Sequence, residues 1–270
     1  MQIPRTSHGR GAQLEEVFLG TGDYVAGGSW SVPFLALDGA RRRRPLIFGE
    51  VSDEPDRYGG LLKEMFSGRQ EDPEEWAVMW KEIGADGVWI DMHGDDASLV
   101  ERIAVRTRLP VAVKGSASLL SKLTMIHGTV MIFICRDGSY SGPVGDHVLS
   151  VQGCCAETLE IESERTESAG RRQIVLDLGG FDVSDGLERS MKRAEKVRER
   201  ALSGNAALRH PAMADTSCCW KKGFEDAREA SMWEAEAALA AMLSGADMIL
   251  MRGPGAADMA RVYGEELADL

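Results

Sequence analysis

The stretch Gly87-Val88-Trp89-Ile90-Asp91-Met92-His93 is the strand from which the fold can be predicted. Its β-branched and aromatic residues form a short apolar run bounded by a glycine and an acidic residue, a pattern typical of a buried strand. Directly after it, Asp95-Asp96-Ala97-Ser98 supplies helix-capping residues and predicts a helix to about Arg108. A buried strand followed by a helix is the repeating unit of a parallel sheet.

Seven further apolar runs lie on either side of this one. They cover residues 45–51, 110–114, 129–135, 147–151, 173–177, 206–216 and 247–251. Eight strand-helix units in about 225 residues match a closed α/β barrel, the single-domain (β/α)8 TIM barrel, better than an open sheet. Residues 136–146 contain Gly138, Gly142, Pro143 and Gly145, so we expect a shortened fourth crossover without a helix.

The segment before the first run predicts a separate small element. Residues 17–34 contain a glycine-rich turn, which indicates a hairpin that closes the bottom of the barrel. We therefore expect residues 1–44 to form an N-terminal arm and barrel-closing hairpin, and residues 45–270 to form the barrel.

Composition limits the partners. The 270 residues include 43 acidic and 31 basic side chains, for a net charge of −12, so no overall field attracts nucleic acid or anionic lipid. There is no run of about 18 apolar residues, as a membrane span requires, and residues 1–10 lack the apolar stretch of a secretory signal. We expect a cytoplasmic protein with neither a nucleic-acid nor a membrane partner.

The cysteines favour packing over metal binding. Cys135, the pair Cys154-Cys155 and the pair Cys218-Cys219 show no C-x-x-C spacing, so a zinc or iron-sulfur site is poorly supported. We expect buried structural thiols. His93 has no second histidine at ligand spacing, and we predict no metal site.

Polar residues at the carboxyl ends of the predicted strands are the candidate functional residues. In a parallel barrel these positions face the ligand-binding mouth, because a polar residue in mid-strand would be buried without partners. The strand ends carry Glu50, Asp91 with His93, Lys114, Asp137, Asp177, Asp215 and Arg252.

Asp91 and Asp177 are the most informative of these residues. Each directly ends an apolar strand and precedes a glycine-containing turn. Such carboxylates can accept two N–H bonds from the amidine-like edge of a pterin or purine ring, or they can accept backbone N–H groups and hold the turns. Lys114 belongs to the same site or pairs with one carboxylate to neutralise it. No residue is identified as catalytic.

Short motifs along the chain resemble those of a known family. They are Gly27-Gly28 with Pro33-Phe34, residues 45–51, Asp72-Pro73-Glu74-Glu75-Trp76-Ala77, Gly84-Ala85-Asp86-Gly87, Pro110-Val111-Ala112-Val113, Ile174-Val175-Leu176-Asp177 and Gly245-Ala246-Asp247-Met248-Ile249-Leu250-Met251-Arg252-Gly253-Pro254. In this order they resemble the delta subunit of the CO dehydrogenase/acetyl-CoA synthase complex, also called the small subunit of the corrinoid iron-sulfur protein. The last motif is the most specific.

The resemblance implies a TIM barrel similar to pterin-dependent methyltransferases, acting in methyl transfer between a tetrahydropterin, a corrinoid and a metal cluster. It implies that Asp91, Asp177 and Lys114 hold the pterin, and we include the neighbouring His93 and Asp215 in this expected site. The corrinoid must come from a partner subunit, because Asp96 replaces the glycine of the corrinoid-binding D-x-H-x-x-G pattern that would start at Asp91. The alternative is a non-catalytic scaffold that supports a corrinoid protein in a heterodimer.

Overall fold

A computed structural model describes residues 12–33, 43–138, 140–184 and 186–269. Eight parallel strands close into a barrel in the order β10-β3-β4-β5-β6-β7-β8-β9. These strands are β3 (Leu46–Ser52), β4 (Gly87–Asp91), β5 (Val111–Gly115), β6 (Ile132–Cys135), β7 (Val148–Gln152), β8 (Ile174–Gly180), β9 (Ala212–Asp215) and β10 (Met248–Met251). The (β/α)8 TIM barrel predicted from the sequence is confirmed.

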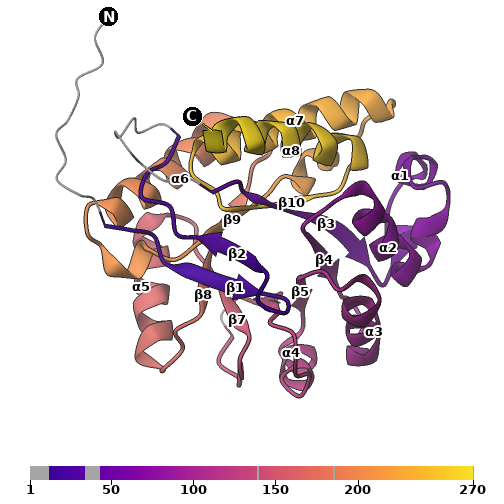
Figure 1. The fold of residues 1–270 in the computed structure, drawn as a ribbon. Coiled ribbons are helices and arrows are strands. Elements are labelled where there is room, and N and C mark those ends of the chain that lie inside the picture. The colour runs from indigo at the N-terminus through magenta and orange to yellow at the C-terminus, as the bar shows by residue number, and fades with distance from the viewer. Residues whose placement is uncertain (1–11, 34–42, 139, 185, 270) are drawn as a thin grey trace, which may run out of the picture.

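Helices surround the barrel (Figure 1). They are α1 (Gly60–Met65), α2 (Pro73–Ile83), α3 (Ala97–Thr107), α4 (Ala117–Leu123), α5 (Ala156–Ser168), α6 (Leu187–Leu202), α7 (Ala227–Leu243) and α8 (Pro254–Asp269), with 3-10 turns η1 (Pro55–Arg57), η2 (Arg69–Glu71), η3 (Ala206–Leu208) and η4 (Ser217–Lys222). Local sequence sets their ends. Asp72 caps α2 by accepting the N–H groups of Glu74 and Glu75, and Gly84, with φ +88°, ends it.

Two apolar cores follow from the alternation of side chains along each strand. Inward-facing residues such as Phe48, Trp89, Val175 and Leu250 fill the barrel. Outward-facing residues such as Ile47 pack against the surrounding helices in a larger cluster. Side chains therefore fill the barrel interior, and a ligand is expected at one end of the barrel.

The N-terminal hairpin covers the bottom of the barrel. Strands β1 (Glu16–Leu19) and β2 (Tyr24–Gly27) pair antiparallel, and Val17 and Leu19 join the interior core. Gly20 bridges to Val130, just before β6. The predicted hairpin is confirmed. Residues 1–11 and 34–42 of the predicted arm lie outside the described residues, and the domain boundary at residue 44 stays a prediction.

The fourth crossover, between β6 and β7, contains no helix in its described residues, as predicted. Arg171 stabilises this loop by donating to the carbonyl oxygens of Tyr140, Ser141 and Gly142 at 2.7–2.8 Å. The predicted run at 206–216 is only partly a strand. Its first part forms η3, and β9 begins at Ala212, because Pro211 removes a backbone donor directly before it.

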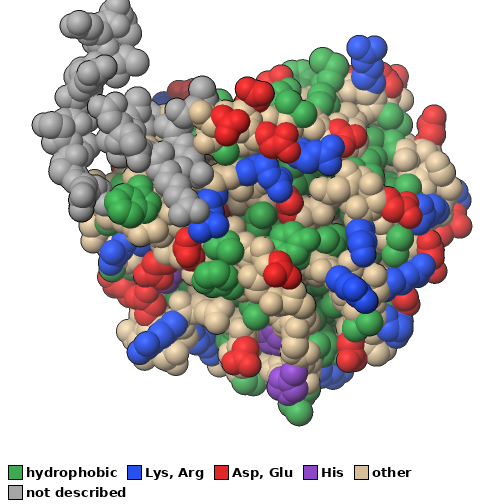
Figure 2. Space-filling model, viewed as in Figure 1, with side chains coloured by type: hydrophobic (Ala, Val, Ile, Leu, Met, Phe, Trp, Pro, Cys, Tyr) green, Lys and Arg blue, Asp and Glu red, His purple; other side chains and the backbone are tan. Residues whose placement is uncertain are grey.

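The surface shows no dominant sign of charge on the face seen in Figure 2, where acidic and basic side chains are interspersed. Among the described residues, no helix combines the length and the apolar character needed to cross a bilayer.

A buried ion pair ties α6 to the bottom of the barrel. Arg198 is fully buried and donates to Asp247 and to the carbonyl oxygens of Gly245 and His210 at 2.8 and 2.9 Å. The same Asp247 carboxylate accepts the N–H of Ala212 at 2.8 Å. One guanidinium therefore joins a helix to the starts of β9 and β10.

We expect Arg198→Met to lower the free energy of unfolding by about 3–5 kcal/mol, because Asp247 would stay buried without its cation. Arg200→Met is the matched control on the same helix, since Arg200 forms partly exposed pairs with Glu157 and Glu160 and should cost no more than about 1 kcal/mol. Urea unfolding of both variants measures this. Equal losses would contradict the anchoring role of Arg198.

Candidate functional site at the barrel mouth

A polar layer caps the apolar interior at the carboxyl ends of the strands. On seven strands this layer begins two residues beyond the last inward-facing apolar residue, where the alternation of side chains again points inward, and on β7 the buried Ser150 comes between Val148 and the layer residue. Seven strands place a charged residue there, and β7 places an amide. Going round the barrel from β10, these residues are Arg252, Glu50, Asp91, Lys114, Arg136, Gln152, Asp177 and Asp215.

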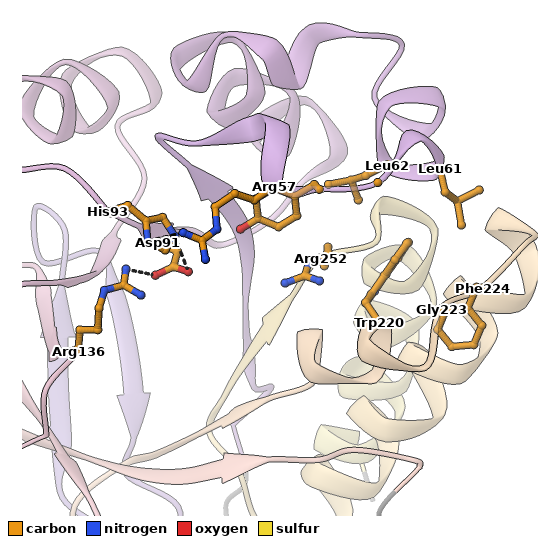
Figure 3. Close-up of a pocket in the computed structure, with 12 residues that line it drawn as sticks. Arg57, Leu61, Leu62, Asp91, His93, Arg136, Trp220, Gly223, Phe224 and Arg252 are labelled. Carbon is orange, nitrogen blue, oxygen red and sulfur yellow. Dashed lines mark hydrogen bonds and ion pairs between the residues drawn. The ribbon is translucent and has the colours of Figure 1, made fainter.

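A cavity of about 440 Å³ opens over one part of this layer (Figure 3). Its polar lining is Arg57, Asp91, His93, Arg136 and Arg252, and its larger apolar lining is Tyr58, Leu61, Leu62, Trp220 and Phe224. The loops after β3 and β9 supply the aromatic side chains. The volume suits a small organic ligand.

Arg252 is the most rigidly held of the lining cations. Both Nε and Nη2 donate to the buried carboxylate of Glu50, with Nη2 3.0 Å from Oε1, and Cζ lies 4.8 Å from the ring centroid of Tyr58. Tyr58 also donates its hydroxyl to Glu50 at 3.0 Å. Although burial opposes the charged form, the nearby Glu50 carboxylate raises the pKa of Arg252.

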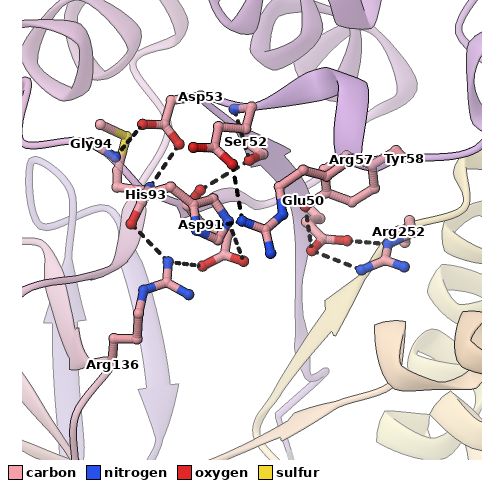
Figure 4. Close-up of polar contacts among 12 residues, drawn as sticks. Glu50, Ser52, Asp53, Arg57, Tyr58, Asp91, His93, Gly94, Arg136 and Arg252 are labelled. Carbon is pink, nitrogen blue, oxygen red and sulfur yellow. Dashed lines mark hydrogen bonds and ion pairs between the residues drawn. The ribbon is translucent and has the colours of Figure 1, made fainter.

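Asp91 is occupied by side chains from its own protein (Figure 4). Arg136 donates through Nη2 to Asp91 Oδ1 at 2.6 Å, and His93 Nε2 lies 3.5 Å from Oδ2. Asp91 therefore does not hold its turn through backbone amides, the non-ligand role considered from the sequence. Asp53 does this instead, accepting the N–H groups of His93 and Gly94 at 2.8 and 2.7 Å.

The contacts of His93 define its tautomer. Arg57 Nη1 lies 3.2 Å from His93 Nδ1. A guanidinium can only donate, so Nδ1 accepts and the ring hydrogen is on Nε2, facing Asp91. The four residues Arg57, His93, Asp91 and Arg136 thus form one chain of donors and acceptors along the cavity wall.

Trp220 is fixed on the opposite wall by a buried carboxylate from α7. Glu234 accepts the indole N–H of Trp220 at 2.9 Å and the backbone N–H groups of Arg252 and Gly253 at 2.7 Å. Burial raises the pKa of Glu234 to about 7. Glu234 therefore links the aromatic wall to the β10 turn that carries Arg252.

The other three predicted residues lie outside this cavity lining. Asp177 accepts the N–H of Gly179 at 2.7 Å, and Asp215 accepts the N–H and hydroxyl of Ser217 at 2.9 and 2.7 Å, so both hold turns. Burial raises the pKa of Asp177 to about 6, with a contribution from Asp215 and opposed by the Gly179 N–H and Lys114. Lys114 Nζ lies 5.7 Å from the ring centroid of Trp89 and forms no ion pair with a described residue.

One sequence-based assignment is wrong. The sequence predicts Asp137 at the end of the fourth strand, but the inward position after Ile134 is Arg136, which pairs with Asp91 and lines the cavity. The period of two along β6 was the signal that could have found it. Arg57, Tyr58 and the aromatic residues of the β9 loop were also missed, because loop residues carry no periodic signal.

The thiol prediction is right for three cysteines and wrong for two. Cys135, Cys218 and Cys219 are buried. Cys154 is exposed and Cys155 is partly exposed, because they lie in the turn where β7 leads into α5 and Cys155 occupies the N-cap position. The described residues contain no group of three or more His, Cys, Asp or Glu that could hold a metal ion.

Solved structures of known proteins share this fold. Dihydropteroate synthase from Thermus thermophilus superposes with a TM-score of 0.58 at 18% identity, covering 93% of this chain and 99% of that one. The Xanthomonas albilineans enzyme in complex with 7,8-dihydropteroate gives 0.58 at 16% identity, with 92% and 98% covered. At these identities the likeness establishes the fold alone.

Sequence similarity connects the chain weakly to one protein complex. Acetyl-CoA decarbonylase/synthase complex subunit gamma 1 from Methanosarcina mazei is 25% identical over 179 residues. The alignment covers 62% of this chain and only 38% of that subunit's length. No family model matches the chain. The similarity supports a relation to subunits of this complex, and these relatives are gamma subunits rather than the delta subunit suggested by the motifs.

The raised pKa of Asp177 predicts a pH-dependent cost to stability. The folded state holds the proton more tightly than the unfolded chain, so the protein loses stability as the pH rises from about 4 to 6. Asp177→Asn removes this cost and can still accept the Gly179 N–H. We expect the variant to gain on the order of 1–3 kcal/mol relative to wild type between pH 4.5 and 7.

Urea unfolding at the two pH values measures the effect. Asp146→Asn is the control, because Asp146 is an exposed carboxylate. The same pH response in both variants would show that burial of Asp177 has no energetic consequence.

Proposed function

We propose that the chain is a cytoplasmic methyl-transfer component of one-carbon metabolism. It binds a methyl-tetrahydropterin, of the tetrahydrofolate or tetrahydromethanopterin type, at the barrel mouth. At the same mouth it docks a corrinoid carried by a partner subunit. The observation that carries the proposal is the 440 Å³ cavity at the carboxyl ends of the strands, where parallel barrels bind ligands.

Similarities in sequence and in structure support this function. The sequence motifs resemble the delta subunit of the CO dehydrogenase/acetyl-CoA synthase complex, and the curated relatives are gamma subunits of acetyl-CoA decarbonylase/synthase. The structural neighbours are dihydropteroate synthases, one in complex with 7,8-dihydropteroate. Each of these relatives handles a pterin or belongs to a complex named for acetyl-CoA chemistry.

The proposed pterin site consists of Asp91, His93, Lys114, Asp177 and Asp215. The carboxylates of Asp177 and Asp215 each keep acceptor capacity beyond the turn N–H groups that they hold, since a carboxylate accepts up to four hydrogen bonds. They are suited to the donor edge of the heterocycle. We assign no catalytic residue, and the corrinoid would come from the partner because this chain lacks the D-x-H-x-x-G pattern.

One observation favours the alternative, a non-catalytic scaffold. Asp91, the carboxylate predicted to grip the ring, is engaged by Arg136 and His93. A barrel that only supports a corrinoid protein would retain such internal pairs. It would bind the cobamide-carrying chain and show no affinity for pterin.

Calorimetry with methyl-tetrahydrofolate tests the proposal. We expect binding to wild type, weakened by about 1–3 kcal/mol in Asp177→Asn, because the amide presents donors where the ligand also presents donors. Asp146→Asn is again the control and should bind like wild type. Absence of heat from a folded wild type would contradict the pterin assignment, and co-purification with a cobamide-binding chain would then support the scaffold.

A further inference from the structure

The mouth cavity presents mainly hydrogen-bond donors, whereas the amidine-like edge of a pterin ring needs acceptors. Its side-chain lining includes three guanidinium groups, from Arg57, Arg136 and Arg252, and one carboxylate. That carboxylate, on Asp91, already accepts from Arg136, and His93 Nε2 lies 3.5 Å from its other oxygen. The donor edge of a heterocycle therefore finds few acceptors on these walls.

In each guanidinium group, some N–H donors are hydrogen-bonded and others have no partner among the described residues. Arg252 uses Nε and Nη2 on Glu50, which leaves Nη1 without a partner among the described residues. Arg136 uses only Nη2, on Asp91 and on the carbonyl oxygen of Met92 at 2.7 Å. The carboxylates fix the direction of the guanidiniums, and the remaining N–H groups are left to the cavity (Figure 3).

Arg57 completes the set from a more exposed position. Its Nη1 is shared between Glu54 Oε2 at 2.9 Å and His93 Nδ1, and no described residue accepts from its Nε or Nη2. Arg57 comes from the loop after β3, Arg136 from the end of β6 and Arg252 from the end of β10. Three separate elements thus bring unpaired donors to one cavity.

We infer that this cavity is an oxyanion subsite, which binds a carboxylate or phosphate group attached to a flat ring. The planar N–H edges of arginine match both oxyanions. The aromatic wall of Tyr58, Trp220 and Phe224 supplies a surface for the ring. Arg252, partly buried against Tyr58 and Glu50, is the most shielded of the three donors.

This inference rests on the proposed function and makes it more specific. In a folate-type ligand, the acceptor-rich part is the aminobenzoyl-glutamate tail, whereas the donor edge belongs to the pterin ring. The cavity would therefore hold the anionic tail rather than the ring's amidine-like edge, leaving that edge for the carboxylates on β8 and β9.

Binding of ligand fragments distinguishes the oxyanion subsite from the proposed pterin function. We would titrate p-aminobenzoyl-glutamate, inorganic phosphate and the uncharged 6-methylpterin into wild type, Arg57→Gln and Arg136→Gln. Arg165→Gln is the matched control, because Arg165 is 73% exposed on α5 and pairs only locally with Glu162. Thermal melting of every variant confirms folding, and Arg57→Gln, whose side chain is 58% exposed, is the variant least able to disturb it.

We expect one of the two oxyanion probes to bind wild type and to lose about 10- to 100-fold in affinity in Arg57→Gln and Arg136→Gln, with weaker binding at higher salt. Preference for the glutamate fragment would identify a carboxylate tail, and preference for phosphate a phosphorylated one. The Arg165→Gln control should match wild type, and 6-methylpterin should lose much less affinity than the oxyanion probe in Arg57→Gln and Arg136→Gln.

The outcomes distinguish the inference from the proposed function. Binding of 6-methylpterin without binding of either oxyanion would overturn the inference and leave the pterin function standing. Binding of an oxyanion without pterin binding would support the subsite and contradict the pterin function. Oxyanion binding that both arginine variants and the control retain equally would place the anion elsewhere and overturn the inference.

Discussion

The whole arrangement depends on the pairing of the first and last barrel strands. Leu46 of β3 lies opposite Met248 of β10, and this contact closes the sheet. At the upper end of the same seam, Arg252 reaches Glu50 across 202 positions of sequence, and Tyr58 contacts both. Without closure the strand ends would lie along an edge rather than around a mouth, and Arg252 would be separated from Glu50.

Closure combined with the period of two along each strand creates the charged layer. An apolar residue such as Phe48 or Trp89 fills the interior, and the next inward position, Glu50 or Asp91, reaches the mouth. Charges at this depth need partners, because burying them alone is costly. Two pairs between strands, Arg252 with Glu50 and Arg136 with Asp91, meet that need for four of these charges and also direct the guanidinium groups toward the cavity.

The sequence was sufficient to predict the fold, because every barrel strand carries its own apolar run and four of the α-helices, α2, α3, α4 and α7, have their own N-cap side chain. It also placed Asp91 and His93 on the cavity, since both follow directly from the end of β4. The prediction was wrong at the end of β6, where the residue that faces the mouth is Arg136 and not Asp137. A shift of one residue along a strand turns the side chain to the other face, and the apolar run alone does not define its last residue. The loop residue Trp220 depended on a tertiary contact with Glu234 that no local pattern encodes.

The charged residues divide the mouth into two parts, one with the guanidinium groups and one with carboxylates that have no ion pair among the described residues. From β10 to β6 the layer contains all of its guanidinium groups, and each of these has a carboxylate within hydrogen-bond distance. On β8 and β9, Asp177 and Asp215 are adjacent carboxylates without an ion pair among the described residues, and their mutual repulsion contributes to the raised pKa of Asp177. A ligand with a donor edge and an oxyanion would therefore have one favourable orientation across the mouth. Its donor edge would lie over β8 and β9, and its oxyanion would lie among the arginines.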